Sequence, residues 1–277
     1  GDEVLLAQRG DTPMLTAGRW WLAVLNLSAS PQTIDLQFAE AQAGAAYALG
    51  AGQSGTWYQP EKNYQGIFLE MIGGGSALAV WFTYQPDGRQ AFFTAVGSVD
   101  GDRIVFPVLT KTRGGRFGAA FDPAAVVRED WGSLVFTFES CGVGYASYLP
   151  NAAAAAQGWA AEQLNAQRLT SVAGIACPGA PPAGKYLHGG ISGSWYDPAR
   201  DGEGWLVEVL GANLGLVYWF SYTPTGEQAW FGGVAPIVDG SILVDAALRP
   251  TGGRFGPDYD PAQVTLEPWG AFRITIA

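Results

Sequence analysis

The feature that most constrains this chain is a duplication in which adding 138 to a residue number gives its counterpart. Three pairs of segments show it: SGTWYQP (54–60) and SGSWYDP (192–198), WFTYQPDG (81–88) and WFSYTPTG (219–226), and GGRFG (114–118) and GGRFG (252–256). A constant offset over so long a stretch marks a duplicated unit, and this unit is much longer than a solenoid repeat. We therefore predict two copies of one domain-sized or half-domain-sized fold.

Within each copy, apolar and aromatic runs alternate with turn residues. The first copy contains GIFLEMI (66–72), ALAVWFTYQ (77–85), QAFFTAVGSV (90–99) and RIVFPVLTKT (103–112), and the second has matching runs beginning at 204, 214, 228 and 241. Such runs, bounded by Gly, Pro and Asp, are typical of β-strands, and their short connections make neighbouring strands antiparallel. We predict an all-β fold of two tandem antiparallel meanders. Each has about six to eight strands and forms a β-barrel or a β-sandwich.

One segment departs from the strand pattern. Residues 151–169, NAAAAAQGWAAEQLNAQRL, begin with a capping Asn and continue with strong helix formers, which predicts one short inserted helix. Residues 178–190 are interpreted as a linker between β repeat 1 (51–177) and β repeat 2 (191–277). Residues 1–50 contain two further predicted strands, RWWLAVLNLS and QTIDLQFAE, which are too few for a stable domain.

The predicted N-terminal strands bear on the question of which strands complete the sheet of the second copy. The first copy continues with CGVGYASY and RLTSVAG, for which the second copy has no counterpart in this sequence. We predict that the N-terminal strands complete the sheet of the second copy by strand addition, within the chain or in a neighbouring subunit. The alternative is an extra hairpin packed against the first copy.

Composition narrows the classes of partner. The formal net charge is −10, which argues against nucleic acid, because phosphate binding needs clustered basic residues. No apolar run is long enough for a transmembrane helix, and the beginning of the chain is interpreted as following a removed leader. Cys141 and Cys177 predict a disulfide and an oxidising, extracytoplasmic location, with two separate buried thiols as the alternative.

Motifs that carry chemistry are few. Asp197, Asp201 and Glu203 do not have the spacing of a calcium loop and are interpreted as turn acids. His188 has no second histidine to help it bind a metal. Without a G-x-S-x-G elbow, a phosphate-binding glycine loop or a Cys–His pair, we predict no cofactor, no metal site and no catalytic residue.

Glu70 and Glu208 are the most informative acids, because each lies among apolar residues on one face of a predicted strand. A carboxylate there must be paired or protonated. One interpretation is a ligand-binding or catalytic carboxylate inside a cup. The favoured interpretation is a structural ion pair, Glu70 with Arg116 and Glu208 with Arg254.

The aromatic residues are interpreted mainly as packing residues. The candidates for ligand binding, which carry polar or aromatic groups on strands, are Glu70, Glu208, Tyr84, Tyr222 and Trp230. The candidates for a structural role in barrel ends and cores are Trp57, Trp195, Arg116, Arg254, Trp131 and Trp269.

Two short motifs, Gly55-Thr56-Trp57 and Gly193-Ser194-Trp195, resemble the G-x-W signature of the calycin barrels, the lipocalins and avidins. The resemblance implies a Trp that closes one barrel end and an Arg from a late strand packed over it, here Arg116 or Arg254. It does not imply biotin, because the polar biotin-binding residues of avidins have no counterparts here. The whole repeat also resembles repeats of secreted proteobacterial proteins of unassigned function. Residues 19–40 resemble the end of a bacterial pre-peptidase C-terminal domain.

Three functions remain open. The first is a secreted, non-catalytic β module for binding or assembly at the bacterial surface or outside the cell. It would be a surface or fibre component, or an accessory to a secreted hydrolase, and its partner a protein or an extracellular glycan. The second is a calycin-like carrier of a small ligand or glycan. The third is a glycosidase, which needs a second carboxylate facing Glu70 or Glu208.

Overall fold

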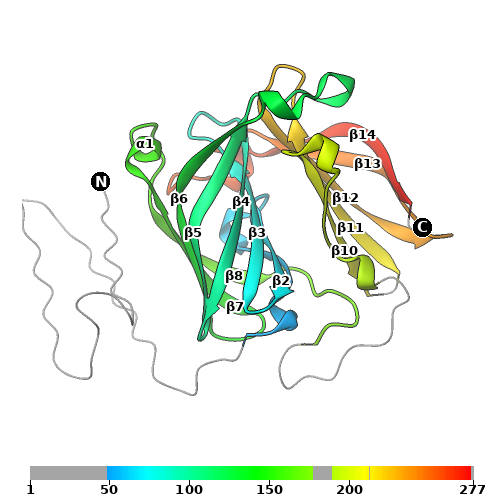
Figure 1. Cartoon of the computed structure of the whole chain (residues 1–277), viewed down its shortest axis with the longest axis horizontal. Helices are drawn as coiled ribbons and strands as arrows, with labels where there is room; N and C mark the ends of the chain where they lie inside the picture. Colours follow the sequence, from blue (N-terminus) through cyan, green and yellow to red (C-terminus); the bar gives the residue numbers. More distant parts are fainter. Residues whose placement is uncertain (1–48, 177–188, 212, 276–277) are drawn as a thin grey trace, which may run out of the picture. The chain divides into compact units, whose positions relative to one another are not determined.

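The computed structural model of the chain describes residues 49–176, 189–211 and 213–275, and its regular structure is mostly β (Figure 1). Contacts group residues 46–277 into one compact unit. The two strands predicted in residues 1–50 lie outside the described residues, and so do Cys177 and His188. The predicted Cys141–Cys177 disulfide therefore stays a prediction.

The first copy forms a closed barrel of eight antiparallel strands. They are β1 (Gly55–Tyr58), β2 (Gly66–Gly73), β3 (Ser76–Tyr84), β4 (Gln90–Asp100), β5 (Arg103–Arg113), β6 (Val127–Phe138), β7 (Val143–Pro150) and β8 (Glu162–Arg168). Each strand pairs with the next one along the chain, and β8 closes the barrel against β1, with Trp57 opposite Arg168. The predicted antiparallel meander is confirmed.

Side chains fill the interior of this barrel. Inward and outward residues alternate along β2, where Leu69 belongs to the interior cluster and Phe68 to a different, outer cluster. Trp81 and Trp131 lie at the centre with ring centroids 5.9 Å apart, and both are at most 2% exposed. The interior is therefore a packed aromatic core, as is usual for a small barrel.

The second copy forms an open sheet of six antiparallel strands. They are β9 (Gly193–Trp195), β10 (Gly204–Leu210), β11 (Leu214–Tyr222), β12 (Gln228–Val238), β13 (Ser241–Thr251) and β14 (Thr265–Thr275). By the repeat offset these correspond to β1 to β6 of the barrel. Within the described part of the chain, β9 pairs only with β10 and β14 only with β13. Among the described residues the sheet therefore has two unpaired edges where the barrel has β7 and β8.

The predicted helix is much shorter than expected. Asn151 does cap it, by accepting a hydrogen bond from the Ala154 N–H, but α1 spans only Ala152–Ala155. Gly158 follows with φ +91°, a conformation that ends a helix, and the last part of the predicted helix is strand β8. Leu164 and Ala166 of β8 point into the barrel core, so closing the barrel outweighs the local helix propensity.

Seven single-turn 3-10 helices precede or connect the strands in the described part of the chain. They are η1 (Ala51–Gln53), η2 (Pro60–Lys62), η3 (Gly118–Ala120), η4 (Pro123–Ala125), η5 (Gly189–Ile191), η6 (Pro198–Arg200) and η7 (Pro261–Gln263). Asp122, Asp197 and Asp260 cap three of them by accepting a backbone N–H bond. None of the helices in the described ranges is long and apolar enough to span a bilayer.

Candidate functional site

The outer faces of the barrel and the second sheet pack against each other through aromatic side chains. The cluster between them, here called the junction, contains Phe68, Val80, Phe82, Tyr84, Phe92 and Val126 from the first copy and Leu206, Tyr222, Trp230 and Tyr259 from the second. Tyr84, Tyr222 and Trp230 are at most 3% exposed. These three ligand-binding candidates therefore lie inside the protein, at a contact between the two repeats.

The junction is symmetric, because equivalent residues make equivalent bonds in both directions. Gln90 donates to the Trp230 carbonyl at 2.9 Å, and its counterpart Gln228 donates to the Phe92 carbonyl at 2.8 Å. The backbone N–H groups of Phe92 and Trp230 donate back to these two side-chain oxygens, each at 3.3 Å. The two buried amides thus join β4 and β12 without leaving a polar group unpaired.

The glycines of the repeated GGRFG segment allow close packing against the two buried tyrosines. A Cβ on Gly253 would lie 2.5 Å from the Tyr84 ring, and one on Gly115 would lie 2.3 Å from the Tyr222 ring. Each glycine therefore lets the loop of one repeat approach a tyrosine of the other closely. The Tyr84 hydroxyl donates to the Tyr64 carbonyl at 2.9 Å, which satisfies its polar end.

The phenylalanine of the same segment enters the aromatic core of the opposite repeat. Phe255 of the second copy packs among barrel residues, with its ring 4.6 Å from that of Trp159 and 5.7 Å from that of Trp81. Phe117 of the first copy packs on the second sheet, 5.0 Å from Trp219 and between further aromatic rings. Each repeat therefore supplies one core residue to the other.

Glu70 and Glu208 also reach across the junction instead of pairing with arginine. Glu208, which is 1% exposed, accepts a hydrogen bond from the Thr56 hydroxyl at 2.8 Å and another from Thr170. Glu70 accepts from the hydroxyl of Ser194 at 2.6 Å and from its backbone N–H at 3.0 Å. Thr56 and Ser194 are equivalent residues, so these contacts follow the same symmetry.

The predicted ion pairs of these acids are not found. Arg116 and Arg254 are exposed residues of the β5–β6 and β13–β14 loops, and neither appears among the ion pairs of the described residues. Burial raises the pKa of Glu208, and the bonds from Thr170 and Thr56 partly oppose this. Two hydroxyl groups thus donate to this buried carboxylate, and the charge of Arg168 also favours its ionised form.

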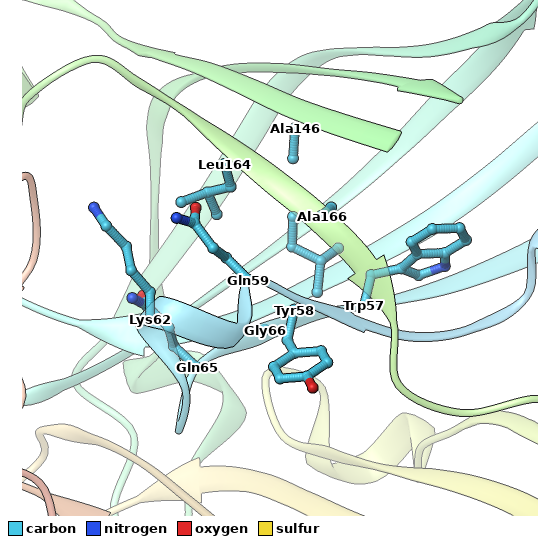
Figure 2. A pocket seen from close by; sticks show the side chains of 10 residues that line it. Trp57, Tyr58, Gln59, Lys62, Gln65, Gly66, Ala146, Leu164 and Ala166 are labelled. Atoms are coloured by element: carbon cyan, nitrogen blue, oxygen red, sulfur yellow. The ribbon is translucent and has the colours of Figure 1, made fainter. Parts of the chain in front are cut away.

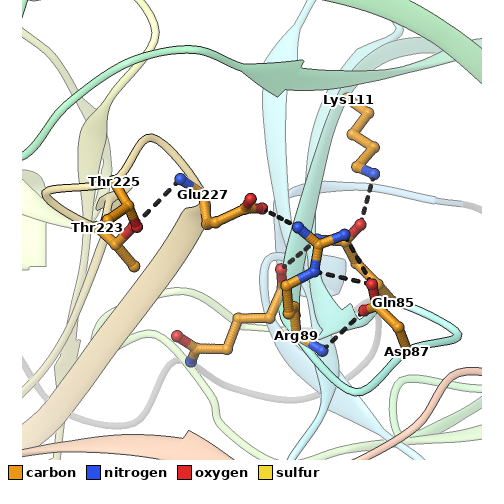
Figure 3. Close-up of polar contacts among 8 residues, drawn as sticks. Gln85, Asp87, Arg89, Lys111, Thr223, Thr225 and Glu227 are labelled. Atoms are coloured by element: carbon orange, nitrogen blue, oxygen red, sulfur yellow. Dashed lines mark hydrogen bonds and ion pairs between the residues drawn. The ribbon is translucent and has the colours of Figure 1, made fainter.

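A surface ion pair connects the hairpin turns of the two repeats (Figure 3). The Arg89 guanidinium lies 2.5 Å from Glu227 and 2.7 Å from Asp87, and these side chains are about half exposed. Beside it, Lys111 donates to the Gln85 side chain at 3.0 Å. Solvent screens such a pair, so it contributes less to the junction than the buried residues do.

The signature tryptophans of the two repeats have very different exposure. Both donate an indole N–H bond to a backbone carbonyl, Trp57 to Gln53 at 2.9 Å and Trp195 to Ile191 at 2.8 Å. Trp57 is 1% exposed, with the rings of β6 against it, whereas Trp195 is 53% exposed. The arginine opposite Trp57 in the sheet is Arg168 of β8, a residue not among the sequence candidates.

Only a small hollow lies beside Trp57, because side chains of β7 and β8 fill this end of the barrel (Figure 2). It measures about 10 Å³, and part of its wall comes from Ala146 of β7 and from Leu164 and Ala166 of β8. The equivalent hollow of the second sheet measures about 320 Å³ and is lined by Asp197, Arg200, Glu203, Gly204, Trp205, Trp219 and the loop residue Gly118. The difference follows from the absence, among the described residues, of strands equivalent to β7 and β8.

The arginine of this larger hollow is placed like a lysine of the barrel. Lys62 donates to the Gly256 carbonyl at 3.1 Å, and its counterpart Arg200 donates to the Gly118 carbonyl at 3.1 Å. Lys62 forms an ion pair with Glu162 of β8, whereas Arg200 pairs with nearby Glu203 at 2.5 Å. Lys62 of the barrel thus binds Glu162 of β8, and the second sheet has a cation, Arg200, at the equivalent position.

The inner face of the second sheet carries a buried apolar cluster that includes Val217 and Ile242, each 0% exposed, but side chains on its edge strands are more exposed. Trp269 is only partly buried, whereas its counterpart Trp131 is 2% exposed. Phe117 and Phe255 were missed by sequence reasoning, although the repeated GGRFG contained the signal. The described residues include no group of three or more His, Cys, Asp or Glu side chains that could hold a metal ion. Comparisons with protein-family models, with curated proteins and with solved structures found no match.

Proposed function

We propose that the protein is a secreted, non-catalytic β module that binds or assembles by accepting β-strands on its second sheet. One observation carries this proposal: the same six strands are completed by β7 and β8 in the barrel, whereas in the second sheet they have two edges that no strand of the described residues pairs with. An unpaired edge presents free backbone donors and acceptors, which an added strand can satisfy. The module would serve as a surface or fibre component, or as an accessory to a secreted hydrolase.

The side chains next to these edges support binding and not catalysis. Trp195 on β9 is 53% exposed, and Phe272 on β14 is only partly buried although it faces the sheet's apolar cluster. Exposed aromatic residues beside an open edge supply apolar area for an incoming strand. Glu70 and Glu208, the acids considered for a glycosidase, are both engaged by hydroxyl groups at the junction.

A glycan-binding alternative is favoured by the hollow of about 320 Å³. The indoles of Trp205 and Trp219 stack there with centroids 4.2 Å apart, next to the Arg200–Glu203 pair. The buried indole N–H of Trp219 has no hydrogen-bond partner within the described ranges, but neither has that of Trp81 in the closed barrel. This N–H therefore does not demand a ligand, and we rank strand addition first.

The test uses the full chain and an inward-pointing charge, which opposes strand addition. Trp195→Lys should abolish concentration-dependent assembly in sedimentation velocity, while Val96→Lys, at a 60% exposed site on the barrel, should leave it unchanged. A glycan array probed with the parent chain and with both variants tests the glycan-binding alternative. Assembly that is insensitive to Trp195→Lys, together with rapid amide exchange in β9 and β14, would refute the proposal.

A further inference from the structure

We infer that the partner of the second sheet is a two-stranded hairpin of the β7–β8 type, which closes this sheet into a second eight-stranded barrel. The inference rests on the proposed function and names the kind of strand that the site accepts. Its basis is the barrel, in which the place between β6 and β1 is occupied by such a hairpin. The equivalent place lies between β14 and β9.

Two strands fit this place better than one. In the barrel, β7 pairs with β6, β8 pairs with β1, and β7 and β8 pair with each other. Both edges of the second sheet are unpaired in the described part of the chain, and β9 and β14 run in opposite directions, so a single strand between them would be antiparallel to only one of these edges. A hairpin satisfies both and leaves no edge, which is the arrangement that closed barrels use.

The barrel also gives the register of the incoming hairpin. Its first strand should run antiparallel to β14, with a residue facing Phe272 as Tyr148 faces Leu134 on β6. Its second strand should run antiparallel to β9, with a residue opposite Tyr196 as Gln167 lies opposite Tyr58. A shift by one residue would turn its apolar side chains away from the sheet's inner face.

The hollow of the second sheet indicates which side chains the incoming hairpin should carry. In the barrel its counterpart is closed by Leu164 and Ala166, which are 6% and 3% exposed. A hairpin with apolar residues at these two positions would fill the larger hollow and cover Trp205. An acid at the position of Glu162 would meet Arg200, as Glu162 meets Lys62.

The core of the second sheet has room for one further ring. In the barrel, Trp159 of the β7–β8 connection contacts Phe255 and Trp131 with centroids 4.6 Å and 5.4 Å away. Phe117 and Trp269 occupy the equivalent positions, and Trp269 is only partly buried. The hairpin should therefore carry an aromatic residue in its connection.

The experiment adds a synthetic peptide of residues 142–169, the barrel's own hairpin, to the full chain and to residues 46–277, which form one compact unit. Binding is measured by native mass spectrometry and by amide exchange in β9 and β14. We expect a one-to-one complex and slowed exchange at both edges. A peptide with Ala146→Pro and Ala166→Pro should bind at least about tenfold more weakly, because proline removes backbone donors from both strands.

A disulfide tests the register. The Gln167→Cys peptide should cross-link to the Tyr196→Cys chain and not to the parent chain, whose own cysteines serve as the control. Binding to residues 46–277 but not to the full chain would show that the first 45 residues already supply the hairpin, which also supports the inference. Binding to neither overturns it. If assembly still depends on Trp195 in that case, the proposed function stands and only the hairpin is refuted.

Discussion

Replacing Phe255 by alanine is the sharpest test of the reciprocal packing between the repeats. Phe255 belongs to the second copy by sequence, but it is 8% exposed within the barrel of the first copy. Four aromatic rings surround it, with centroids between 4.6 Å (Trp159) and 6.0 Å (Trp131). Its removal therefore leaves a cavity in a core that strands confine on all sides.

The expected cost is large and can be bounded. Truncation of a buried phenylalanine in a confined core costs about 3–5 kcal/mol of unfolding free energy. For a unit of this size, each kcal/mol lowers Tm by about 2–4 °C, so we expect a decrease on the order of 10 °C. Phe117→Ala is the matched control: Phe117 is only partly buried and faces an open sheet, so its loss should cost about 1–2 kcal/mol.

The assay combines urea unfolding of the full-length variants with amide hydrogen exchange. Phe255→Ala should accelerate exchange in β3, β6 and β7 of the barrel, whose side chains touch its ring, although the substitution lies in the other repeat. Phe117→Ala should act on β11, β12 and β14. A loss below about 1 kcal/mol for Phe255→Ala would refute the reasoning. So would faster exchange confined to the second sheet.

Three further variants test individual contacts. Burial raises the pKa of Glu208, so the free energy of unfolding should be greatest below the ordinary glutamate pKa and should fall as the pH rises toward the raised value. Glu208→Gln should flatten this part of the pH profile of urea unfolding, and Glu61→Gln, at an exposed site, controls for net charge. Arg89→Ala should cost less than about 1 kcal/mol in urea unfolding, and a cost that does not shrink with added salt would contradict a surface pair. Gly253→Ala should cost about 1–3 kcal/mol by thermal unfolding, because its Cβ would meet the Tyr84 ring at 2.5 Å; an unchanged Tm would contradict this close approach.

The strands of each copy could be predicted from the sequence because their signals are local. Alternating apolar residues and short turns indicated β2 to β5 and β10 to β13 within a few residues of their observed bounds. Strand β8 could not be predicted in this way. Its sequence, EQLNAQR, follows an alanine run and contains only Leu164 and Ala166 as apolar residues, and its partner β1 lies about a hundred residues earlier in the chain.

The candidate site was only partly predictable, for a different reason. The offset identifies equivalent residues, but it does not tell which repeat supplies a partner. Glu208 was therefore paired with Arg254 of its own copy, whereas its donors Thr56 and Thr170 precede the second copy in the chain. Trp230 was considered a ligand-binding candidate, yet its counterpart is Phe92, and the exchange of one aromatic ring for another is what a buried, symmetric junction tolerates.

The symmetry of the junction and the asymmetry of the sheets lead to one conclusion about why the sequence is duplicated. The GGRFG loops, the two glutamines and the two glutamates of each copy contact residues of the other copy, so neither repeat can satisfy its junction face alone. The junction therefore holds both copies in a fixed relation, whatever happens at the far side of the second sheet. Trp57 and Trp195 make the same indole bond, and only the second remains exposed. A repeat that the junction fixes at one face, and whose two edges are unpaired in the described part of the chain, would bind the proposed hairpin without first having to fold.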